Sequence, residues 1–266
     1  MPIHLLQIAK KLAHDAGHMA LKMQKKSFQI SSKGSSSSNL VTDVDKACED
    51  LIISTIKKHF PDHSILSEEA GEITGSGDYK WIIDPIDGTT NFAHGLPFFA
   101  ISIGIAYQGK PIIGVVEIPA LGESFWAQEG RGAHLGNKKI QVSATDRLDK
   151  GLMATGFPYE RGGDRYNMNM KLFDHFYKSG HGVRRLGVAS IDLCYTAAGR
   201  FDAYWEYGLK PWDIAAGKII LEEAGGTVTN MDGSKLNPKN ESLLATNTRL
   251  HSTLLQEFKK MGADKL

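Results

Sequence analysis

The spacing of apolar residues changes along the chain, and this change constrains the fold more than any other feature. Within residues 3–25, apolar side chains recur at helical spacing and predict an amphipathic helix. A second helical stretch should begin at Thr42 and Asp45, which have the spacing of a helix-start signature, and end before Pro61. Between residues 65 and 128 the pattern becomes short β-rich runs separated by glycine-containing turns. This half is therefore expected to contain a sheet built largely from hairpins.

Beyond residue 150 the pattern alternates between strands and helices. Strands are expected at 152–155, 201–206, 227–229 and 242–245, and helices at 164–177, 189–198 and 212–224, before a closing helix. Such an alternation favours sheets covered by helices, so we expect a layered α/β fold. Because no linker divides the chain, we expect a single domain over residues 1–266, with halves of about 1–148 and 149–266.

The composition excludes several classes of protein. The 266 residues are 41% hydrophobic and 23% charged, which is typical of a globular chain and not of a disordered or fibrous one. Lys and Arg number 31 against 30 Asp and Glu, so the net charge of +1 provides no basic field for nucleic acid or anionic lipid. Charged residues interrupt the apolar residues at the N-terminus, and no later run is long enough to span a membrane. We therefore expect a cytoplasmic protein that does not bind membranes or, directly, nucleic acid.

Two carboxylates follow an apolar run in the segment WIIDPIDGTTNF, residues 81–92. Asp84 is expected at the end of the strand, where Pro85 keeps it out of helical geometry. Asp84 and Asp87 can then converge on one point, with the Ile86 carbonyl between them. Carboxylates this close must share a proton or bind a cation, and oxygen ligands without nearby Cys or His favour Mg²⁺, Mn²⁺ or Ca²⁺ over zinc. We expect magnesium.

The residues after this pair, Gly88, Thr89 and Thr90, are expected to begin a helix whose N–H groups would donate to a phosphate oxygen. Taken alone, the Asp-Pro-Ile-Asp-Gly segment is also typical of a simple turn. Two further acidic residues favour the functional interpretation: Glu68 after another short strand, and Asp213 at a helix start. Each has an ordinary alternative, because Glu68 could be a solvated acid and Asp213 could cap its helix. The set of carboxylates predicts a metal site beside a phosphate site.

At these residues the chain resembles the inositol monophosphatase family of magnesium-dependent, lithium-sensitive phosphatases. The resemblance rests on three blocks in the expected order, which are the glutamates at 68–69, residues 81–92, and Trp212-Asp213 with the Glu-Ala-Gly-Gly of 223–226. It implies a five-layer αβαβα sandwich, a homodimer, and hydrolysis of a small phosphate ester, with inositol 1-phosphate as the leading substrate. It also implies two or three Mg²⁺ ions per site, with Mn²⁺ as a substitute and Ca²⁺ and Li⁺ as inhibitors.

Carried over residue by residue, the resemblance implies three sets of site residues. The implied metal ligands are Glu68, Asp84, the Ile86 carbonyl, Asp87 and Asp213. The implied catalytic residues are Glu68 and Thr89, which position and activate the attacking water, and Asp45 near that water. The implied substrate contacts are Ile86, Asp87, Gly88, Thr89, Arg184, Gly187, Val188, Ala189, Glu206 and Asp213.

Two features bear on the substrate side of this assignment. Val188 stands where animal members of the family carry a hydroxyl residue, so a side-chain hydrogen bond to substrate is not available there. Residues 31–39 contain mostly serine and predict a mobile loop, in which Lys33 is the implied residue that closes over the site.

The sequence leaves the exact reaction open among related possibilities. Relatives acting on fructose 1,6-bisphosphate, 3′-phosphoadenosine compounds or histidinol phosphate share the metal site, so only the substrate-side residues separate them. The resemblance also implies a possible partner in transcription or ribosomal RNA processing, as for some bacterial members. No Ser-His-Asp or cysteine nucleophile pattern is visible. We therefore expect a water molecule activated by the metal to attack phosphorus directly.

Overall fold

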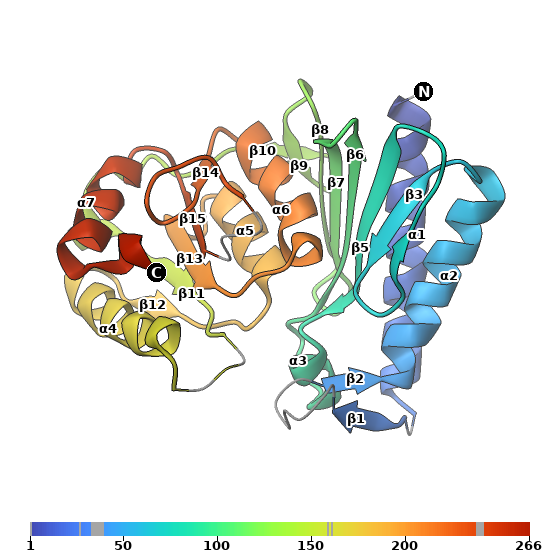
Figure 1. The fold of residues 1–266 in the computed structure, drawn as a ribbon, viewed down its shortest axis with the longest axis horizontal. Helices are drawn as coiled ribbons and strands as arrows, with labels where there is room; N and C mark the ends of the chain where they lie inside the picture. The colour runs from blue at the N-terminus through green and yellow to red at the C-terminus, as the bar shows by residue number, and fades with distance from the viewer. Residues whose placement is uncertain (1, 27, 33–39, 159, 161, 238–241) are drawn as a thin grey trace.

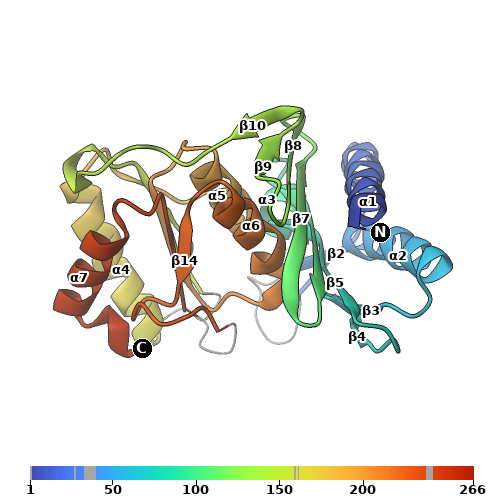
Figure 2. The same ribbon diagram turned by 90° about the horizontal axis from the view of Figure 1, so that it is seen from above.

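The chain folds into five layers in the order helix, sheet, helix, sheet, helix (Figures 1 and 2). The structure is a computed structural model that describes residues 2–26, 28–32, 40–158, 160, 162–237 and 242–266. The outer helices cover one face of each sheet, and the middle helices lie between the two sheets. The expected layered α/β sandwich is therefore confirmed.

The first layer consists of helices α1 (Pro2–Gln24) and α2 (Asp43–His59), which pack against each other and on the large sheet (Figure 1). Helix α2 begins where the sequence predicted. The Thr42 side chain accepts hydrogen bonds from the N–H groups of Val44 and Asp45, and the Asp45 carboxylate accepts one from the N–H of Thr42. This reciprocal cap fixes the first turn of α2.

A short hairpin precedes α2. Its strands are β1 (Ile30–Ser32) and β2 (Leu40–Thr42), which pair antiparallel. The predicted loop is therefore wrong at its first residues, because Ser31 pairs with Val41 in a strand ladder. The rest of that segment, including Lys33, lies outside the described residues.

The large sheet has eight strands in the order β10-β9-β8-β7-β6-β5-β3-β4. Neighbours are antiparallel except β3 and β5, which are parallel. The strands are β3 (Ser64–Ser67), β4 (Gly71–Ile73), β5 (Tyr79–Asp87), β6 (Ala100–Tyr107), β7 (Lys110–Ile118), β8 (Glu123–Gln128), β9 (Ala133–Leu135) and β10 (Lys138–Ile140). The hairpin-rich sheet predicted for this half is confirmed.

The middle layer contains α5 (Ala189–Ala197) and α6 (Pro211–Glu223). Helix α6 lies very close to the large sheet because β7 offers a glycine there: a Cβ at Gly114 would lie 2.4 Å from a backbone oxygen of α6. The Ser102 hydroxyl of β6 also donates a hydrogen bond of 3.3 Å to the carbonyl of Trp212. The first turn of α6 is thereby held beside β5 and β6.

The second sheet has five strands in the order β12-β11-β13-β15-β14. Its strands are β11 (Met153–Thr155), β12 (Val183–Arg184), β13 (Ala203–Tyr207), β14 (Thr227–Thr229) and β15 (Ser242–Thr246). Helices α4 (Asp164–Ser179) and α7 (His251–Met261) cover its outer face (Figure 2), and three short helices complete the described elements: α3 (Thr89–Ala93), η1 (Leu148–Lys150) and η2 (Ala263–Lys265).

Three buried apolar clusters follow these layers. One lies between α1, α2 and the large sheet, a second contains α5 and α6 with residues of both sheets, and a third lies under α4 and α7. Among the described helices, none has the length and apolar character needed to cross a lipid bilayer. The largest buried side chains are aromatic, with Trp81 in the first cluster and Trp205 in the third.

Candidate active site

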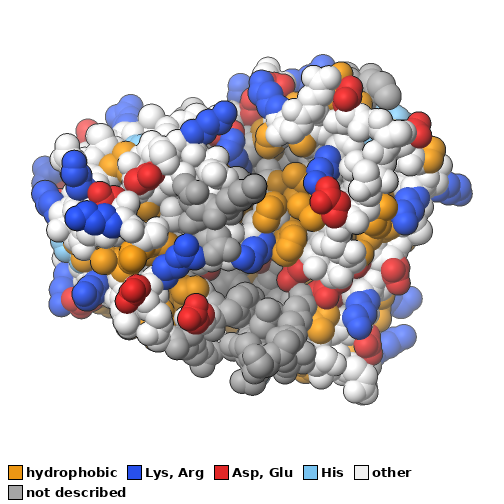
Figure 3. Space-filling view, viewed as in Figure 1, with side chains coloured by type: hydrophobic (Ala, Val, Ile, Leu, Met, Phe, Trp, Pro, Cys, Tyr) orange, Lys and Arg blue, Asp and Glu red, His pale blue; other side chains and the backbone are white. Residues whose placement is uncertain are grey.

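A cavity of about 260 Å³ is lined by residues of both sheets and of the middle helices. The face of the molecule in Figure 3 is hollowed between its two halves, and charged side chains of both signs border the hollow. The cavity is lined by these residues predicted from the sequence: Glu68, Asp84, Ile86, Asp87, Gly88, Thr89, Gly187, Ala189, Glu206 and Asp213. Three other predicted residues, Asp45, Arg184 and Val188, are not part of its described lining.

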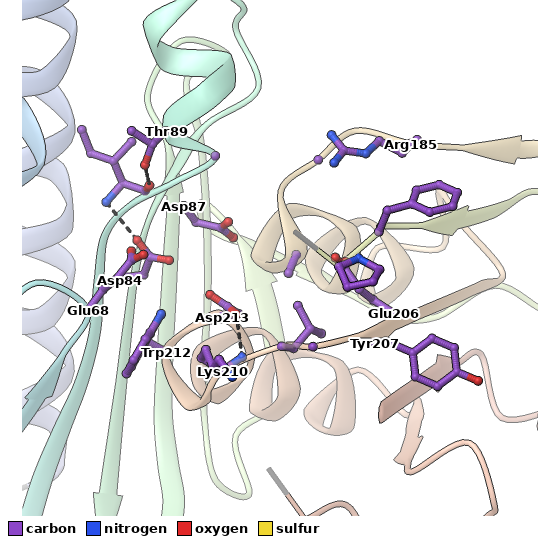
Figure 4. A pocket seen from close by; sticks show the side chains of 18 residues that line it. Glu68, Asp84, Asp87, Thr89, Arg185, Glu206, Tyr207, Lys210, Trp212 and Asp213 are labelled. Atoms are coloured by element: carbon purple, nitrogen blue, oxygen red, sulfur yellow. Dashed lines mark hydrogen bonds between the residues drawn. The ribbon is translucent and has the colours of Figure 1, made fainter. Parts of the chain in front are cut away.

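Five carboxylates from four elements of the fold surround this cavity (Figure 4). Glu68 lies in the turn after β3, while Asp84 and Asp87 belong to β5. Glu206 belongs to β13, and Asp213 lies in the first turn of α6. Segments that are distant in the sequence therefore form one acidic surface.

Strand β5 does not end at Asp84, so that expectation is wrong. Its pairing with β6 continues to Asp87, with a shift of register between Asp84 and Asp87. Pro85 lies inside this shift, which suits a residue without an N–H to donate to the ladder. Asp84 Oδ1 instead accepts the N–H of Ile86 at 3.0 Å. The bulge leaves Asp84 and Asp87 only 2% and 8% exposed while both border the cavity.

Backbone N–H groups donate hydrogen bonds to two of these carboxylates. Asp87 Oδ2 accepts the N–H of Ser190 at 2.8 Å, which joins β5 to the start of α5. Asp213 Oδ2 accepts the N–H of Lys210 at 2.7 Å, which closes the first turn of α6. The capping role considered for Asp213 from the sequence is therefore present, and the same side chain also borders the cavity.

Burial and mutual repulsion raise the pKa of three carboxyl groups in this cluster. The pKa of Asp84 lies well above its usual range, first because of burial and then because of the nearby charges of Glu68, Asp87 and Asp213. Burial raises the pKa of Asp87 to about 6, although the hydrogen bond from Ser190 opposes the shift. Burial, followed by the charge of Asp87, raises the pKa of Asp213. Such carboxylates cannot all be ionised without a compensating positive charge, so the cluster favours a bound cation.

The chemistry of this donor set fits a hard divalent cation. The cavity lining offers carboxylates and the Ile86 carbonyl, and its described residues include no Cys or His. Within the described part of the chain, however, no three His, Cys, Asp or Glu side chains already enclose a point suited to an ion. One oxygen each of Asp84, Asp87 and Asp213 accepts a hydrogen bond from a backbone N–H group.

Thr89 connects the cavity to helix α2. Its hydroxyl donates to Asp45 Oδ1 at 2.9 Å and lies 3.1 Å from the Ile86 carbonyl oxygen. Asp45 is fully buried, and burial raises its pKa although hydrogen bonds from Thr42 and Thr89 oppose the shift. Asp45 is therefore connected to the cavity through the Thr89 hydroxyl.

Gly88 explains why Val188 does not line the cavity. Gly88 has a positive φ of 90°, a conformation that favours glycine, and a Cβ there would lie 2.7 Å from Val188 Cγ2. Val188 is only 1% exposed. Val188 therefore packs against Gly88, whereas Gly187 and Ala189 border the cavity, and a contact between Val188 and substrate stays a prediction.

Arg185 and Lys210 are the cationic residues in the described lining of the cavity, whereas the sequence analysis expected Arg184. Arg184 lies in β12, and neighbouring residues of an extended segment point in opposite directions. Gly187 makes room for the guanidinium, because a Cβ there would lie 2.2 Å from Arg185 Nη1. Sequence reasoning missed Arg185 because the sequence does not show which of two adjacent arginines faces the cavity.

Glu206 lies in a space formed by two neighbours. The Tyr204 hydroxyl donates to Glu206 Oε2 at 2.5 Å, and a Cβ at Gly156 would lie 1.9 Å from the same oxygen. Burial raises the pKa of Glu206 to about 7, against the opposing effects of the Tyr204 hydrogen bond and the charge of Arg185. This carboxyl group therefore sits close to its titration point near neutral pH.

Several lining residues were not predicted at all. They are Phe157, Pro158, Tyr207, Gly208, Leu209, Lys210 and Trp212. Position along the chain was the available signal for most of them, because they lie between the predicted residues Glu206 and Asp213. Phe157 and Pro158 follow β11, where no motif drew attention.

Comparison with known proteins identifies the family. The model of the inositol monophosphatase family matches residues 2–263. The chain belongs to this family. Among its relatives, the phosphatase IMPL1, chloroplastic, of Arabidopsis thaliana is 46% identical, with 97% of this chain and 70% of that protein covered. The inositol-1-monophosphatase of Synechocystis sp. is 44% identical (94% and 87% covered), and the Nus factor SuhB of Pseudomonas aeruginosa is 41% identical (94% of each).

Solved structures of inositol monophosphatase family proteins share the same fold. The extragenic suppressor protein suhB from Bartonella henselae superposes with a TM-score of 0.91 at 35% identity, covering 97% of this chain and 99% of that chain. The inositol monophosphatase from Anabaena superposes with a TM-score of 0.86 at 40% identity, covering 97% and 96%. As a member of this generally metal-dependent family, the protein is a phosphatase.

Proposed function

We propose that the protein is a Mg²⁺-dependent phosphomonoesterase that hydrolyses inositol 1-phosphate or a similar small polyol monophosphate. One observation carries this proposal: the carboxylates of Glu68, Asp84, Asp87 and Asp213 share a cavity with Gly88 and Thr89 at the start of α3. The acidic side can hold cations, and the backbone N–H groups at the start of α3 can donate to an anionic phosphate. The cations and the phosphate group of the substrate thus fit within one cavity.

The oxygen donors of the cavity would hold two or three Mg²⁺ ions. The proposed ligands are Glu68, Asp84, the Ile86 carbonyl, Asp87 and Asp213. When bound, the cations supply positive charge against the phosphoryl oxygens and activate water. Mn²⁺ should substitute for Mg²⁺, whereas Ca²⁺ and Li⁺ should inhibit.

The attacking water would be oriented by Thr89 and Glu68. Because the Thr89 hydroxyl hydrogen is directed to Asp45 Oδ1, the Thr89 oxygen can accept a hydrogen bond from a water in the cavity. The Glu68 carboxylate can accept the second hydrogen of that water and then its proton as the oxygen attacks phosphorus. Asp45 thus keeps Thr89 in the acceptor role that this step needs.

The cavity favours direct displacement over a phosphoenzyme. Its described lining contains no Ser, Cys or His to act as a nucleophile on phosphorus. The Thr89 hydroxyl is also already committed to Asp45 and Ile86. The carboxylates at the acidic side are assigned to metal binding in this proposal, so water is the nucleophile that the arrangement favours.

The other end of the cavity suits a hydroxylated alcohol. Arg185 supplies hydrogen-bond donors and Glu206 supplies acceptors, so vicinal hydroxyl groups can be bound from both sides. The relative from Synechocystis is named an inositol-1-monophosphatase, which supports a polyol. We therefore rank inositol 1-phosphate above fructose 1,6-bisphosphate, 3′-phosphoadenosine compounds and histidinol phosphate.

Phosphate release from a panel of esters tests this assignment. The panel contains inositol 1-phosphate, glycerol 2-phosphate and the three rival classes, each with Mg²⁺, with Mg²⁺ plus Li⁺, and with EDTA. We expect the highest kcat/KM for inositol 1-phosphate, inhibition by Li⁺ and no turnover in EDTA. A higher kcat/KM for any rival class would replace the proposed substrate, and turnover in EDTA would contradict the metal assignment.

We also infer that the chain acts as one catalytic domain and forms a homodimer. Support for one domain comes from the cavity, to which residues 1–148 contribute Asp84 and residues 149–266 contribute Asp213. The dimer and a cytoplasmic location follow from the family resemblance and the sequence pattern, and light scattering tests the dimer. The relatives named Nus factor SuhB raise a separate partner role in transcription. An Asp87→Asn variant that rescued every phenotype of a deletion strain would favour that role over catalysis.

A further inference from the structure

Helix α2 carries a second buried carboxylate that the proposed reaction does not use. Glu49 is only 4% exposed. Its Oε1 accepts the N–H of Glu69 at 3.0 Å and the N–H of Ala70 at 3.1 Å, and the Ser67 hydroxyl also donates to it. These three donors surround Glu68 in the sequence. Glu49 therefore binds, through hydrogen bonds, the turn in which Glu68 borders the cavity.

That turn joins β3 to β4, and β4 is the edge strand of the large sheet. The N–H of Glu68 donates to the Ile83 carbonyl of β5 at 3.2 Å. Side chains on this hairpin are largely half-buried or exposed, so packing alone fixes them weakly. The Glu49 carboxylate is a buried acceptor that meets three donors of this segment.

The same helix also holds the other group proposed to orient water. Asp45 lies one helical turn before Glu49, so the two side chains lie on the same face of α2. Asp45 holds the Thr89 hydroxyl, and Glu49 holds the turn that contains Glu68. Thr89 and the turn that contains Glu68 are therefore both hydrogen-bonded to side chains of the same helix.

We propose that Glu49 is a positioning residue that places Glu68 for metal binding and water activation, and that α2 sets the spacing of Glu68 and Thr89 through Glu49 and Asp45. This inference rests on the proposed function, which assigns Glu68 and Thr89 to the reaction. The proposed role depends on the length of the Glu49 side chain. The Glu49 side chain must be long enough for one carboxylate oxygen to meet the Ser67 hydroxyl and both N–H groups of the turn.

Two conservative substitutions distinguish the effect of the length of the Glu49 side chain from the effect of its charge. Glu49→Gln keeps the length of the side chain and an oxygen that can accept the same hydrogen bonds, but it removes the charge. Glu49→Asp keeps the charge but shortens the side chain by one methylene, so the oxygen no longer reaches the turn. Glu49→Ala removes both. Asp50→Ala is the matched control, because Asp50 is the next residue of α2 and is exposed.

The measurements are Mn²⁺ affinity by calorimetry, hydrogen exchange of the Glu69 and Ala70 amides in EDTA, and Tm. For Glu49→Asp and Glu49→Ala we expect the Kd for Mn²⁺ to rise about tenfold to a hundredfold, as for other residues that orient metal ligands. Both amides should exchange faster. Glu49→Gln should stay within about threefold of the wild type in Kd, and Asp50→Ala should match the wild type.

The outcomes separate this inference from a purely structural role and from the proposed function. A Glu49→Asp protein that binds Mn²⁺ like the wild type overturns the inference, whatever its Tm, and so does a Glu49→Gln protein that is as impaired as Glu49→Asp. If Glu49→Ala does not fold, the Asp and Gln variants decide. Failure of the wild type to bind Mn²⁺ or release phosphate would instead refute the proposed function, while amide exchange would still report whether Glu49 holds the turn.

Discussion

The two ends of the cavity are held in place by different parts of the chain. At the acidic end, the Asp84, Asp87 and Asp213 carboxylates accept hydrogen bonds from backbone N–H groups. At the alcohol end, Arg185 is exposed, and the described hydrogen bond to Glu206 comes from a side chain, that of Tyr204. The acidic end therefore depends on the fold itself, whereas the alcohol end depends on individual side chains. We therefore expect substitutions at the alcohol end to alter the preferred alcohol more than they disturb the acidic end.

The largest effect is expected at the acidic end, from Asp87→Asn. Removing this charge from the proposed ion site should lower kcat by on the order of a hundredfold or more, comparable with the loss of one electrostatic group in other enzymes. The same change removes repulsion within the cluster, so the Tm in EDTA should not fall and the Asn oxygen can still accept the N–H of Ser190. Steady-state kinetics with Mg²⁺ and thermal unfolding in EDTA measure the two quantities.

The Asp87→Asn variant tests whether the two ends of the cavity have different functions. If Asp87→Asn retained wild-type kcat, the acidic end would not be the reaction centre. A matched Glu206→Gln substitution at the alcohol end should leave kcat closer to the wild type and should change the ranking of substrates. Equal losses of kcat in both variants would show that the two ends are not separate in function.

A smaller effect is expected for Thr89→Val, which keeps the shape of the side chain and removes the hydroxyl. The variant loses both the proposed acceptor for water and the hydrogen bond to buried Asp45. We expect kcat to fall about tenfold to a hundredfold, as for other residues that orient reactive groups. Thr90→Val is the control, because Thr90 is the next residue and is exposed. If both variants behaved alike, the role assigned to the Thr89 hydroxyl would be wrong.

At the alcohol end, adjacent arginines form a natural pair of variants. Arg185 lines the cavity and Arg184 does not, although both side chains are exposed. Arg185→Ala should raise KM for inositol 1-phosphate up to about tenfold, which corresponds to about 1.4 kcal/mol of binding. Its kcat should change little, and Arg184→Ala should resemble the wild type in both. The opposite ranking of the two KM values would place Arg184 at the substrate.

The acidic end could be predicted from sequence because its signals are local. An apolar run before Asp84, a helix-start pattern before Asp213 and the cap of α2 each follow from the geometry of a single element. The layered α/β class also followed from the change in apolar spacing, whereas the order of five layers was implied only by the family resemblance. The extension of β5 to Asp87 could not be predicted, because Pro85 normally argues against a continuing strand and only the bulge accommodates it.

The alcohol end and the support of Glu68 depend on contacts between distant segments, which a single sequence does not show. Val188 faces Gly88 because the start of α5 lies against the end of β5, and nothing near Val188 in the sequence indicates this. Glu49 likewise resembles any acidic residue of an amphipathic helix until the turn around Glu68 is placed against it. Sequence reasoning thus identified residues with unusual chemistry more readily than residues that position them.

The smallest expected effect concerns the pH dependence of stability without metal, and it involves both ends. In the folded protein the pKa is about 6 for Asp87 and about 7 for Glu206, whereas unfolded Asp and Glu titrate near about 4. Since the folded state then holds protons that the unfolded chain releases, the free energy of unfolding should decrease as pH rises from about 4 to about 7. In EDTA we expect Tm to fall by several degrees over this range, because a loss of 1 kcal/mol lowers Tm by about 2 to 4 °C in a chain of this size.

Two variants and the addition of Mg²⁺ show which end of the cavity causes this decrease in the free energy of unfolding. Asp87→Asn should make the decrease below pH 6 smaller, and Glu206→Gln should make the decrease up to pH 7 smaller, because each removes one titrating group. Asp84 and Asp213, whose pKa values are also raised, should maintain the rest of the decrease. Mg²⁺ should offset mainly the contributions of Asp84, Asp87 and Asp213, since bound cations stabilise the ionised carboxylates of the acidic end. Full loss of the pH dependence on adding Mg²⁺ would mean that Glu206 also senses the ions, and the division of the cavity into two ends would then have to be abandoned.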